Sequence, residues 1–314
     1  MLASDAVESK IRFPCIIMPK IDGVRGLSSN GTLTGRSLKT HKNKYATKFF
    51  SSPILAGLDG EMAAHEDCCK DDLCRITSSA LSTISGEPNI VWWLFDFIDQ
   101  GAVNEPYKER VRVLAYHVDH LIKAYPALAP HLKLVPWMKC DGLDNLLAQE
   151  QLWLEMGYEG LIIRNPEAVH KEGRSTVREG GLLRIKRFIE EEAVVLRLIE
   201  GETNNNEKQT NELGRSFRSS HQENKTPNGM LATMECAVLK DIPDPYTKGK
   251  ILFAKDQIIT VNAGCMTHEE RIMYWEHPEM IVNHIIKFKF FPKGIKDKPR
   301  FPNFQAIRGA ADIG

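Results

Sequence analysis

The sequence predicts an α+β protein of two domains, in which a mixed α/β domain is followed by a small β-barrel of the OB type. Its 314 residues exceed one ordinary small domain. Up to about residue 189, strand-like runs are interspersed with two stretches of helical periodicity. Beyond it, strand-like runs surround one helical stretch. We therefore expect domains at 1–189 and 190–314.

The composition fits an intracellular protein. Charged residues make up 26% and hydrophobic residues 42% of the chain. No apolar run approaches the roughly 20 residues of a membrane span, and the N-terminus lacks the features of a signal peptide. The seven cysteines show no framework spacing, which fits free thiols in a reducing compartment. Because the formal net charge is zero, binding of nucleic acid would require cations gathered on one face.

Strand-like runs open the first domain. PCIIMP (14–19) is a short apolar run typical of a buried strand, and Asn30-Gly31 is a hairpin signal within the run 27–35. The runs 54–62 and 90–98 are rich in β-branched or aromatic residues.

Helical spacing of apolar residues predicts helices over 107–125 and 143–156. The run 158–165 is typical of a further strand. LLRIKRF (182–188) alternates apolar and basic residues, so its cations are expected to share one face.

The second domain is predicted to be mostly strand. One helix is expected at 267–278, and strands are expected at 191–201, 230–240, 250–261 and 281–291. The stretch 202–229 is polar and Asn-rich. Its composition is typical of a disordered surface loop, but a long loop in a compact domain is also often functional.

The strongest chemical signal is K-x-D-G-x-R at residues 20–25, directly after the first strand. Chance produces it in on the order of one chain in a few hundred, and alone it also fits a plain hairpin turn. A lysine attacks phosphorus only as a free amine, and burial and neighbouring cations lower its pKa. With Arg25 and Lys186 as available cations, we expect Lys20 to be a nucleophile with a lowered pKa.

Further residues of suitable type follow in order. Glu61 ends a strand, Phe95 offers a ring that stacks on a purine, and Glu159 is a candidate carboxylate on the metal side. Arg184 and Lys186, two positions apart, point two cations toward a phosphate. Each alone is more often structural, and their joint occurrence favours nucleotide chemistry.

With these motifs the chain resembles the nucleotidyltransferase superfamily of ATP-dependent DNA ligases and mRNA capping enzymes, most of all the minimal viral ligases. The resemblance runs through 13–25, 158–188 and 287–308, the last with an RFP-x-F-x-x-IR pattern. It implies an ATP-grasp-like nucleotidyltransferase domain with antiparallel sheets, then an OB-fold. The insert at 202–229 matches a DNA-clamping latch hairpin, which capping enzymes lack.

The resemblance implies a role for each motif residue. Lys20 becomes lysyl-AMP, Asp22 assists the last step near the nick, and Glu159 lies near the metal. DNA contacts are expected from Arg36, on the 5′-phosphate side, and from Arg215 and Arg218 in the latch. Nucleotide contacts are expected from Arg25, Glu61 (ribose), Phe95 (adenine), Arg174, Arg184, Lys186 (α-phosphate), Arg300 and Arg308. Two departures stand out: Arg184 replaces the usual lysine, and Gly35 replaces the serine that commonly precedes the arginine.

These roles imply an ATP-dependent DNA ligase that seals 3′-OH/5′-phosphate nicks in duplex DNA during replication, repair or recombination. We expect a monomer that uses ATP and Mg²⁺, with Mn²⁺ as an alternative ion. Cations for DNA binding crowd the C-terminal stretch at Lys287, Lys289, Lys293, Lys296, Lys298 and Arg300. The alternatives are a capping-type guanylyltransferase, an RNA ligase, or a non-catalytic nucleic-acid-binding protein of the same fold.

Overall fold

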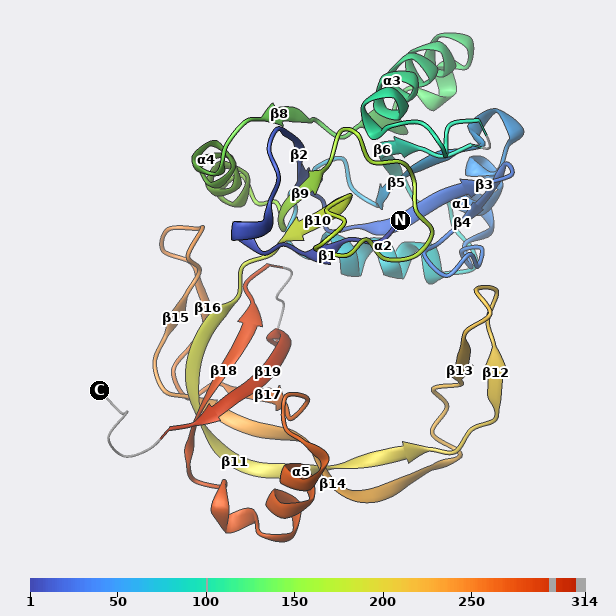
Figure 1. Ribbon diagram of the computed structural model, residues 1–314. Helices are drawn as coiled ribbons and strands as arrows, with labels where there is room; N and C mark the ends of the chain where they lie inside the picture. The colour runs from blue at the N-terminus through green and yellow to red at the C-terminus, as the bar shows by residue number, and fades with distance from the viewer. Residues whose placement is uncertain (100, 294–297, 309–314) are drawn as a thin grey trace. The chain divides into compact units, whose positions relative to one another are not determined.

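The computed structural model describes residues 1–99, 101–293 and 298–308. The chain forms two compact units, Met1–Lys186 and Arg187–Gly314, called here the first and second unit (Figure 1). Within the described ranges, no helix combines the length and the apolar character that a membrane crossing needs.

Two five-stranded sheets form the first unit. Neighbouring strands run antiparallel, except that β1 pairs with β10, and β6 with β7, in parallel. One sheet has the order β1 (Ser4–Asp5), β10 (Leu182–Ile185), β9 (Gly160–Arg164), β2 (Cys15–Lys20), β8 (Met138–Cys140). The other has the order β4 (Thr32–Thr34), β3 (Val24–Ser29), β5 (Leu58–Ala63), β6 (Val91–Phe97), β7 (Leu132–Leu134). The hairpin signal is confirmed, since Asn30 and Gly31, both with positive φ, join β3 to β4.

Among the described residues of the first unit, four helices accompany these sheets. They are α1 (Lys44–Phe50), α2 (Leu73–Ser82), α3 (Tyr107–Ala124) and α4 (Leu143–Glu155), with short 3₁₀ turns at Glu8–Lys10, Pro53–Leu55 and Pro126–Leu128. The predictions of α3 and α4 are confirmed. In α3, Leu114, Val118 and Leu121 lie three or four residues apart and bury one side of the helix in the core that contains Trp92.

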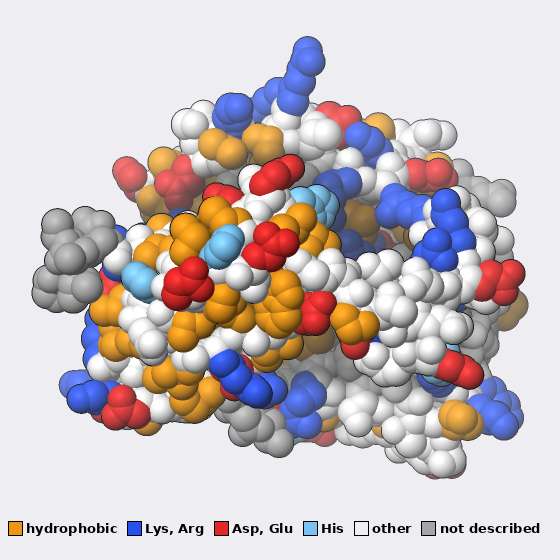
Figure 2. All heavy atoms as spheres, turned by 90° about the horizontal axis from the view of Figure 1, so that it is seen from below, with side chains coloured by type: hydrophobic (Ala, Val, Ile, Leu, Met, Phe, Trp, Pro, Cys, Tyr) orange, Lys and Arg blue, Asp and Glu red, His pale blue; other side chains and the backbone are white. Residues whose placement is uncertain are grey.

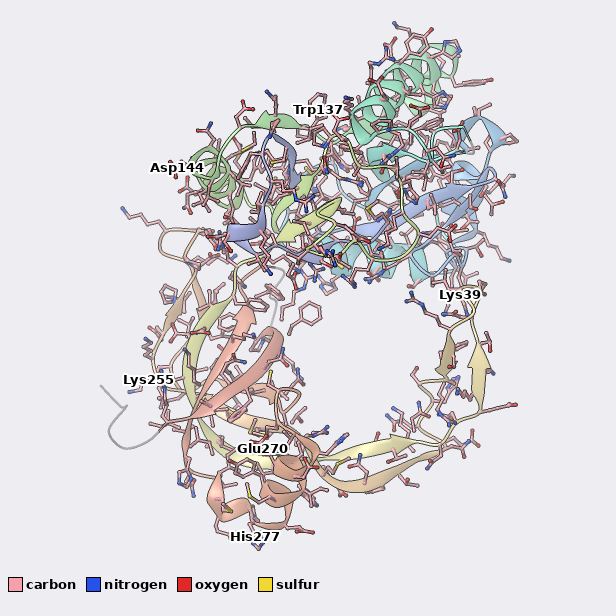
Figure 3. The ribbon with its side chains drawn as sticks, in the orientation of Figure 1. Lys39, Trp137, Asp144, Lys255, Glu270 and His277 are labelled. Carbon is pink, nitrogen blue, oxygen red and sulfur yellow. The ribbon has the colours of Figure 1, made fainter. Side chains whose placement is uncertain are left out.

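The second unit contains a closed barrel of five strands. Its order is β11 (Ile189–Asn204), β14 (Lys225–Val238), β17 (Ile258–Asn262), β19 (Arg300–Ile307), β18 (Ile285–Phe291). Alternation along β18 buries Ile286, Phe288 and Phe290 in the barrel core. Helix α5 (His268–Glu276) starts with a capping box between Thr267 and Glu270 (Figure 3). A 3₁₀ turn follows at Pro278–Met280.

Strands make up half of the polar stretch 202–229, so the expectation of a disordered loop was wrong. β11 and β14 continue as a two-stranded ribbon as far as the pair Asn204–Lys225, and beyond it β12 (Lys208–Thr210) and β13 (Ser216–Arg218) form a hairpin (Figure 1). The Asn206 amide donates to the carbonyls of Ser219 (3.0 Å) and His221 (2.8 Å). Hydrogen bonds, rather than apolar burial, therefore order this segment.

The prediction of a single strand at 250–261 was also wrong. A turn that includes the exposed Lys255 (Figure 3) and Asp256, with φ +64°, breaks the run in two. β16 (Ile251–Phe253) pairs with β15 (Ile242–Pro243), whereas β17 belongs to the barrel. Two strand starts were placed too early as well: Pro53–Leu55 is a 3₁₀ turn, and β18 begins only at Ile285.

Candidate functional site

Lys20 is the last residue of β2, a strand whose other residues are all buried. The Lys20 carbonyl accepts a hydrogen bond from the backbone N–H of Glu159 at 3.0 Å, and Lys20 pairs in register with Gly160. In the turn that follows, a Cβ on Gly23 would collide with the Met62 carbonyl. The Gly of K-x-D-G-x-R is therefore required by a close backbone approach.

The Glu159 carboxylate joins two lysines. Lys20 Nζ donates to Oε2, and Lys186 Nζ pairs with Oε1. Glu159 is almost fully buried, while Lys20 keeps part of its side chain open. The structure thus brings together three predicted site residues.

The electrostatics at Lys20 correct the predicted lowered pKa. Burial by itself would lower the pKa, but the negative charges of Glu159, Glu61 and Asp22 outweigh it and raise the Lys20 pKa above its ordinary value. The sequence argument was wrong because it counted cations and left out the acids. Arg25 is paired with Asp59, and the carboxylates of Glu159, Glu61 and Asp22 determine the direction of the Lys20 pKa shift.

The pKa values of the two acids Glu159 and Glu61 are shifted in opposite directions. Burial would raise the pKa of Glu159, but Lys20 and Lys186 lower it to about 2, so it is ionised near neutral pH. Burial raises the pKa of Glu61 to about 7, against the pull of Lys20 and Arg25. Glu61 is therefore poised to exchange a proton near neutral pH.

Lys20 opens onto a pocket of about 370 Å³. Seven predicted site residues from separate parts of the first unit line it: Lys20, Arg25, Arg36, Glu61, Phe95, Arg174 and Arg184. With Arg164, which was not predicted, five arginines and an aromatic ring surround the lysine. Such a cavity is suited to a base and its phosphates.

Arg25 is held in the pocket wall by contacts with two neighbouring side chains. Its Nε and Nη2 both donate to the buried carboxylate of Asp59, and its guanidinium lies 4.9 Å from the centre of the Phe95 ring. The Phe95 carbonyl in turn accepts from the Tyr107 hydroxyl at 2.8 Å. In the run LDGE (58–61), sequence reasoning assigned a role only to Glu61. It missed Asp59, two residues earlier, although a second acid in this short run was a signal for a charge partner.

The N-terminal segment supplies a wall that sequence reasoning missed. Leu2 and Ala3 line the pocket, Arg174 donates to the Ala3 carbonyl, and Arg184 Nε donates to Asp5 Oδ1 at 2.7 Å. A two-residue strand carries no periodicity, so β1 had no recognisable signal.

Four predicted site residues lie in the second unit. Arg308 Nε donates to Glu192 Oε1 at 2.6 Å, and the Arg300 guanidinium lies 5.5 Å from the Phe301 ring centre. Arg215 and Arg218 are exposed on the β12–β13 hairpin, where Arg218 donates to the Asn206 carbonyl.

The chain, with its strand-ending lysine beside a carboxylate and its second unit containing a barrel, has the fold of solved ATP-dependent DNA ligases. Lig E DNA ligase shares this fold with a TM-score of 0.65 and 19% identity over 98% of both chains. The comparison with Chlorella virus DNA ligase-adenylate gives a TM-score of 0.50 and 23% sequence identity over 98% of both chains. The comparison with the ATP-dependent DNA ligase of bacteriophage T7 in complex with ATP gives a TM-score of 0.50 and 14% sequence identity over 98% of this chain and 97% of that one. No protein-family model and no curated protein sequence matches the chain.

Proposed function

We propose that the chain is an ATP-dependent DNA ligase that seals nicks between a 3′-hydroxyl and a 5′-phosphate in duplex DNA. The observation that carries the proposal is the placing of Lys20 beside Glu159 at the pocket that seven motif residues line. The fold shared with three DNA ligases supports it.

The reaction consists of three displacements at phosphorus. The Lys20 amine, after losing a proton, attacks the α-phosphorus of ATP, and pyrophosphate leaves. The 5′-phosphate of the nick then attacks the lysyl-AMP phosphorus and releases Lys20. Finally the 3′-hydroxyl, with Asp22 assisting, attacks the activated 5′-phosphate and AMP leaves.

The pocket residues divide this work by their chemistry. Phe95 stacks on adenine, and Glu61 holds the ribose. Arg25, Arg174, Arg184 and Lys186 offset charge on the phosphates, and Arg36 engages the 5′-phosphate side. Arg184 can replace a lysine here because a guanidinium also binds phosphate, although its planar fork requires different geometry.

The site also fits Mg²⁺, or Mn²⁺ in its place. Carboxylate oxygens are the ligands these ions prefer, and Mg²⁺ usually takes one or two of them together with waters and phosphates. Glu159 would hold the ion. When bound, the metal supplies positive charge against the phosphate oxygens and against Glu159, which favours an uncharged Lys20.

We propose that the second unit binds the DNA. We infer that the barrel is an OB-fold, that 202–229 is a latch, and that Arg300 and Arg308 orient the pyrophosphate. Hydrophobic, acidic and histidine side chains dominate the barrel face around α5 (Figure 2). We propose that the unit binds DNA through cations outside this face. Those cations are Arg215, Arg218 and the C-terminal lysines, of which Lys296 lies outside the described residues.

A nick-sealing assay on duplex DNA tests the proposal. Wild-type protein with ATP and Mg²⁺ is expected to seal the nick and to carry an adenylate adduct on Lys20 by mass spectrometry. Lys20→Ala should lose both, while Lys123→Ala, at an exposed lysine of α3, should keep both. Absence of an adduct on wild-type protein overturns the enzyme assignment, and an adduct from GTP alone would indicate a capping-type enzyme.

We further propose a monomer that acts inside the cell in DNA replication, repair or recombination. A single copy of the chain contains the lysine, its pocket and the hairpin that the reaction requires. Sedimentation of the purified protein, alone and with nicked DNA, measures the number of copies.

A further inference from the structure

One buried carboxylate in the first unit binds two arginines. Asp96 of β6 accepts from Arg110 Nε at 2.8 Å and Nη2 at 3.1 Å, and from Arg164 Nη2 at 3.0 Å. All three side chains are at most 2% exposed. Burial would raise the Asp96 pKa, but the arginines hold it below its usual range. Two guanidinium groups against one carboxylate leave an excess positive charge.

The two arginines differ in their remaining hydrogen bonds. Arg110 Nη1 also donates to the carbonyls of Glu105 (2.7 Å) and Ala168 (3.2 Å). Arg164 Nε is buried and has no hydrogen-bond partner among the residues that the structure describes. A buried donor without an acceptor is unfavourable. Of the two, only Arg164 lines the pocket that Lys20 opens onto.

Arg164 lies beside the ring on which we expect the base to stack. Its guanidinium is 5.9 Å from the centre of the Phe95 ring and 4.4 Å from that of Tyr107. Tyr107 also bonds the Phe95 carbonyl, so the two rings and the arginine form one packed group. Phe95 and Arg164 line the same pocket, so a base stacked on this ring would have the Arg164 guanidinium in the pocket wall.

We propose that Arg164 recognises the nucleotide base by donating a hydrogen bond to a ring nitrogen of adenine. The inference rests on the proposed function and adds to it the residue that reads the base. Asp96 and Arg110 are positioning residues, because they fix the Arg164 guanidinium without lining the pocket.

Adenine analogues test this with wild-type protein. ATP, 1-deaza-ATP, 3-deaza-ATP and 7-deaza-ATP each keep the stacking surface, and each deaza compound lacks one acceptor nitrogen. We expect one of them to raise the concentration for half-maximal formation of the lysine adduct by about tenfold, a difference of 1.4 kcal/mol. If all three analogues behave like ATP, the inference is wrong.

Matched variants locate the contact. Arg164→Met and Arg110→Met each remove one cation from Asp96, and thermal unfolding shows whether both fold. Arg164→Met should need at least tenfold more ATP and should no longer distinguish the sensitive analogue, whereas Arg110→Met should still distinguish it. Discrimination that survives Arg164→Met overturns the inference. The proposed function fails separately, if wild-type protein forms no adduct with ATP.

Discussion

Lys20 and Glu159 are joined twice, through the Glu159 backbone N–H to the Lys20 carbonyl and through the Lys20 ammonium to the Glu159 carboxylate. The backbone bond belongs to the β2–β9 pairing, so the sheet itself holds the carboxylate against the amine. This pairing keeps Lys20 protonated until the charge of Glu159 is offset.

Glu159→Gln is expected to lower the pKa of Lys20, because it removes the largest attracting charge. The pH at which adduct formation reaches half of its maximum should therefore move to lower values. The maximal rate should fall at least tenfold, since the proposed metal-side carboxylate is lost. Single-turnover rates of adduct formation between pH 6 and 10 measure both effects. Glu155→Gln, at an exposed acid of α4, serves as the control. An unshifted profile would contradict the prediction.

Asp59→Asn is expected to destabilise the fold, because it leaves the Arg25 guanidinium without its buried counter-charge. Breaking a buried pair costs about 3–5 kcal/mol, and we expect the low end because Arg25 borders the pocket. Urea unfolding measures the change. Asp119→Asn removes an exposed pair with Lys123 and should cost less than about 1 kcal/mol. Equal losses in the two variants would argue against a structural role for Asp59.

Glu61 is expected to make stability depend on pH near neutrality. Because burial raises its folded-state pKa to about 7, the folded protein holds this proton more tightly than the unfolded chain does. The contribution is full below the unfolded pKa of about 4.5 and is lost as the pH rises through 7. The free energy of unfolding of wild type should thus fall, relative to Glu61→Gln, by on the order of 2 kcal/mol between pH 5 and pH 8. If the free energies of unfolding of wild type and Glu61→Gln change in parallel with pH, the prediction is wrong.

Deletion of residues 203–228 is expected to weaken binding to nicked DNA at least tenfold. Adduct formation should change by less than twofold, since the removed segment contributes no residue to the Lys20 pocket. Fluorescence anisotropy with labelled nicked duplex and mass spectrometry of the adduct measure the two quantities. Equal losses of DNA binding and of adduct formation would mean that the segment supports the fold.

Arg215→Ala combined with Arg218→Ala is expected to flatten the salt dependence of DNA binding. If each arginine contacts one phosphate, the slope of log affinity against log salt should decrease in magnitude by about 2. Affinity should fall alike for different DNA sequences, because phosphate contacts carry no sequence information. An unchanged slope would exclude both arginines from the DNA interface.

Local sequence patterns predicted the elements that bury an apolar face. The periodicity of α3 and the Asn30-Gly31 turn were recognisable because each follows from short-range geometry. Composition alone did not predict the ribbon at 202–229, where only the resemblance implied a hairpin, because its order comes from backbone pairing and Asn206 hydrogen bonds, which leave no apolar period. Motif spacing likewise identified Lys20 and its pocket partners. It could not show that Asp59 pairs with Arg25, nor that Asp5 pairs with Arg184, because those pairings depend on sheet register and on a distant chain segment.

The β11–β14 ribbon beyond the barrel has a consequence for local stability. Its tip is held by main-chain and amide hydrogen bonds rather than by a hydrophobic core, so it can open by itself at low energetic cost. Amide protons there should exchange with solvent far faster than those of β17 or β18, and a protease should nick the tip while the barrel stays intact. A segment of this kind can also change in length and sequence over evolution without disturbing the folded body that carries it.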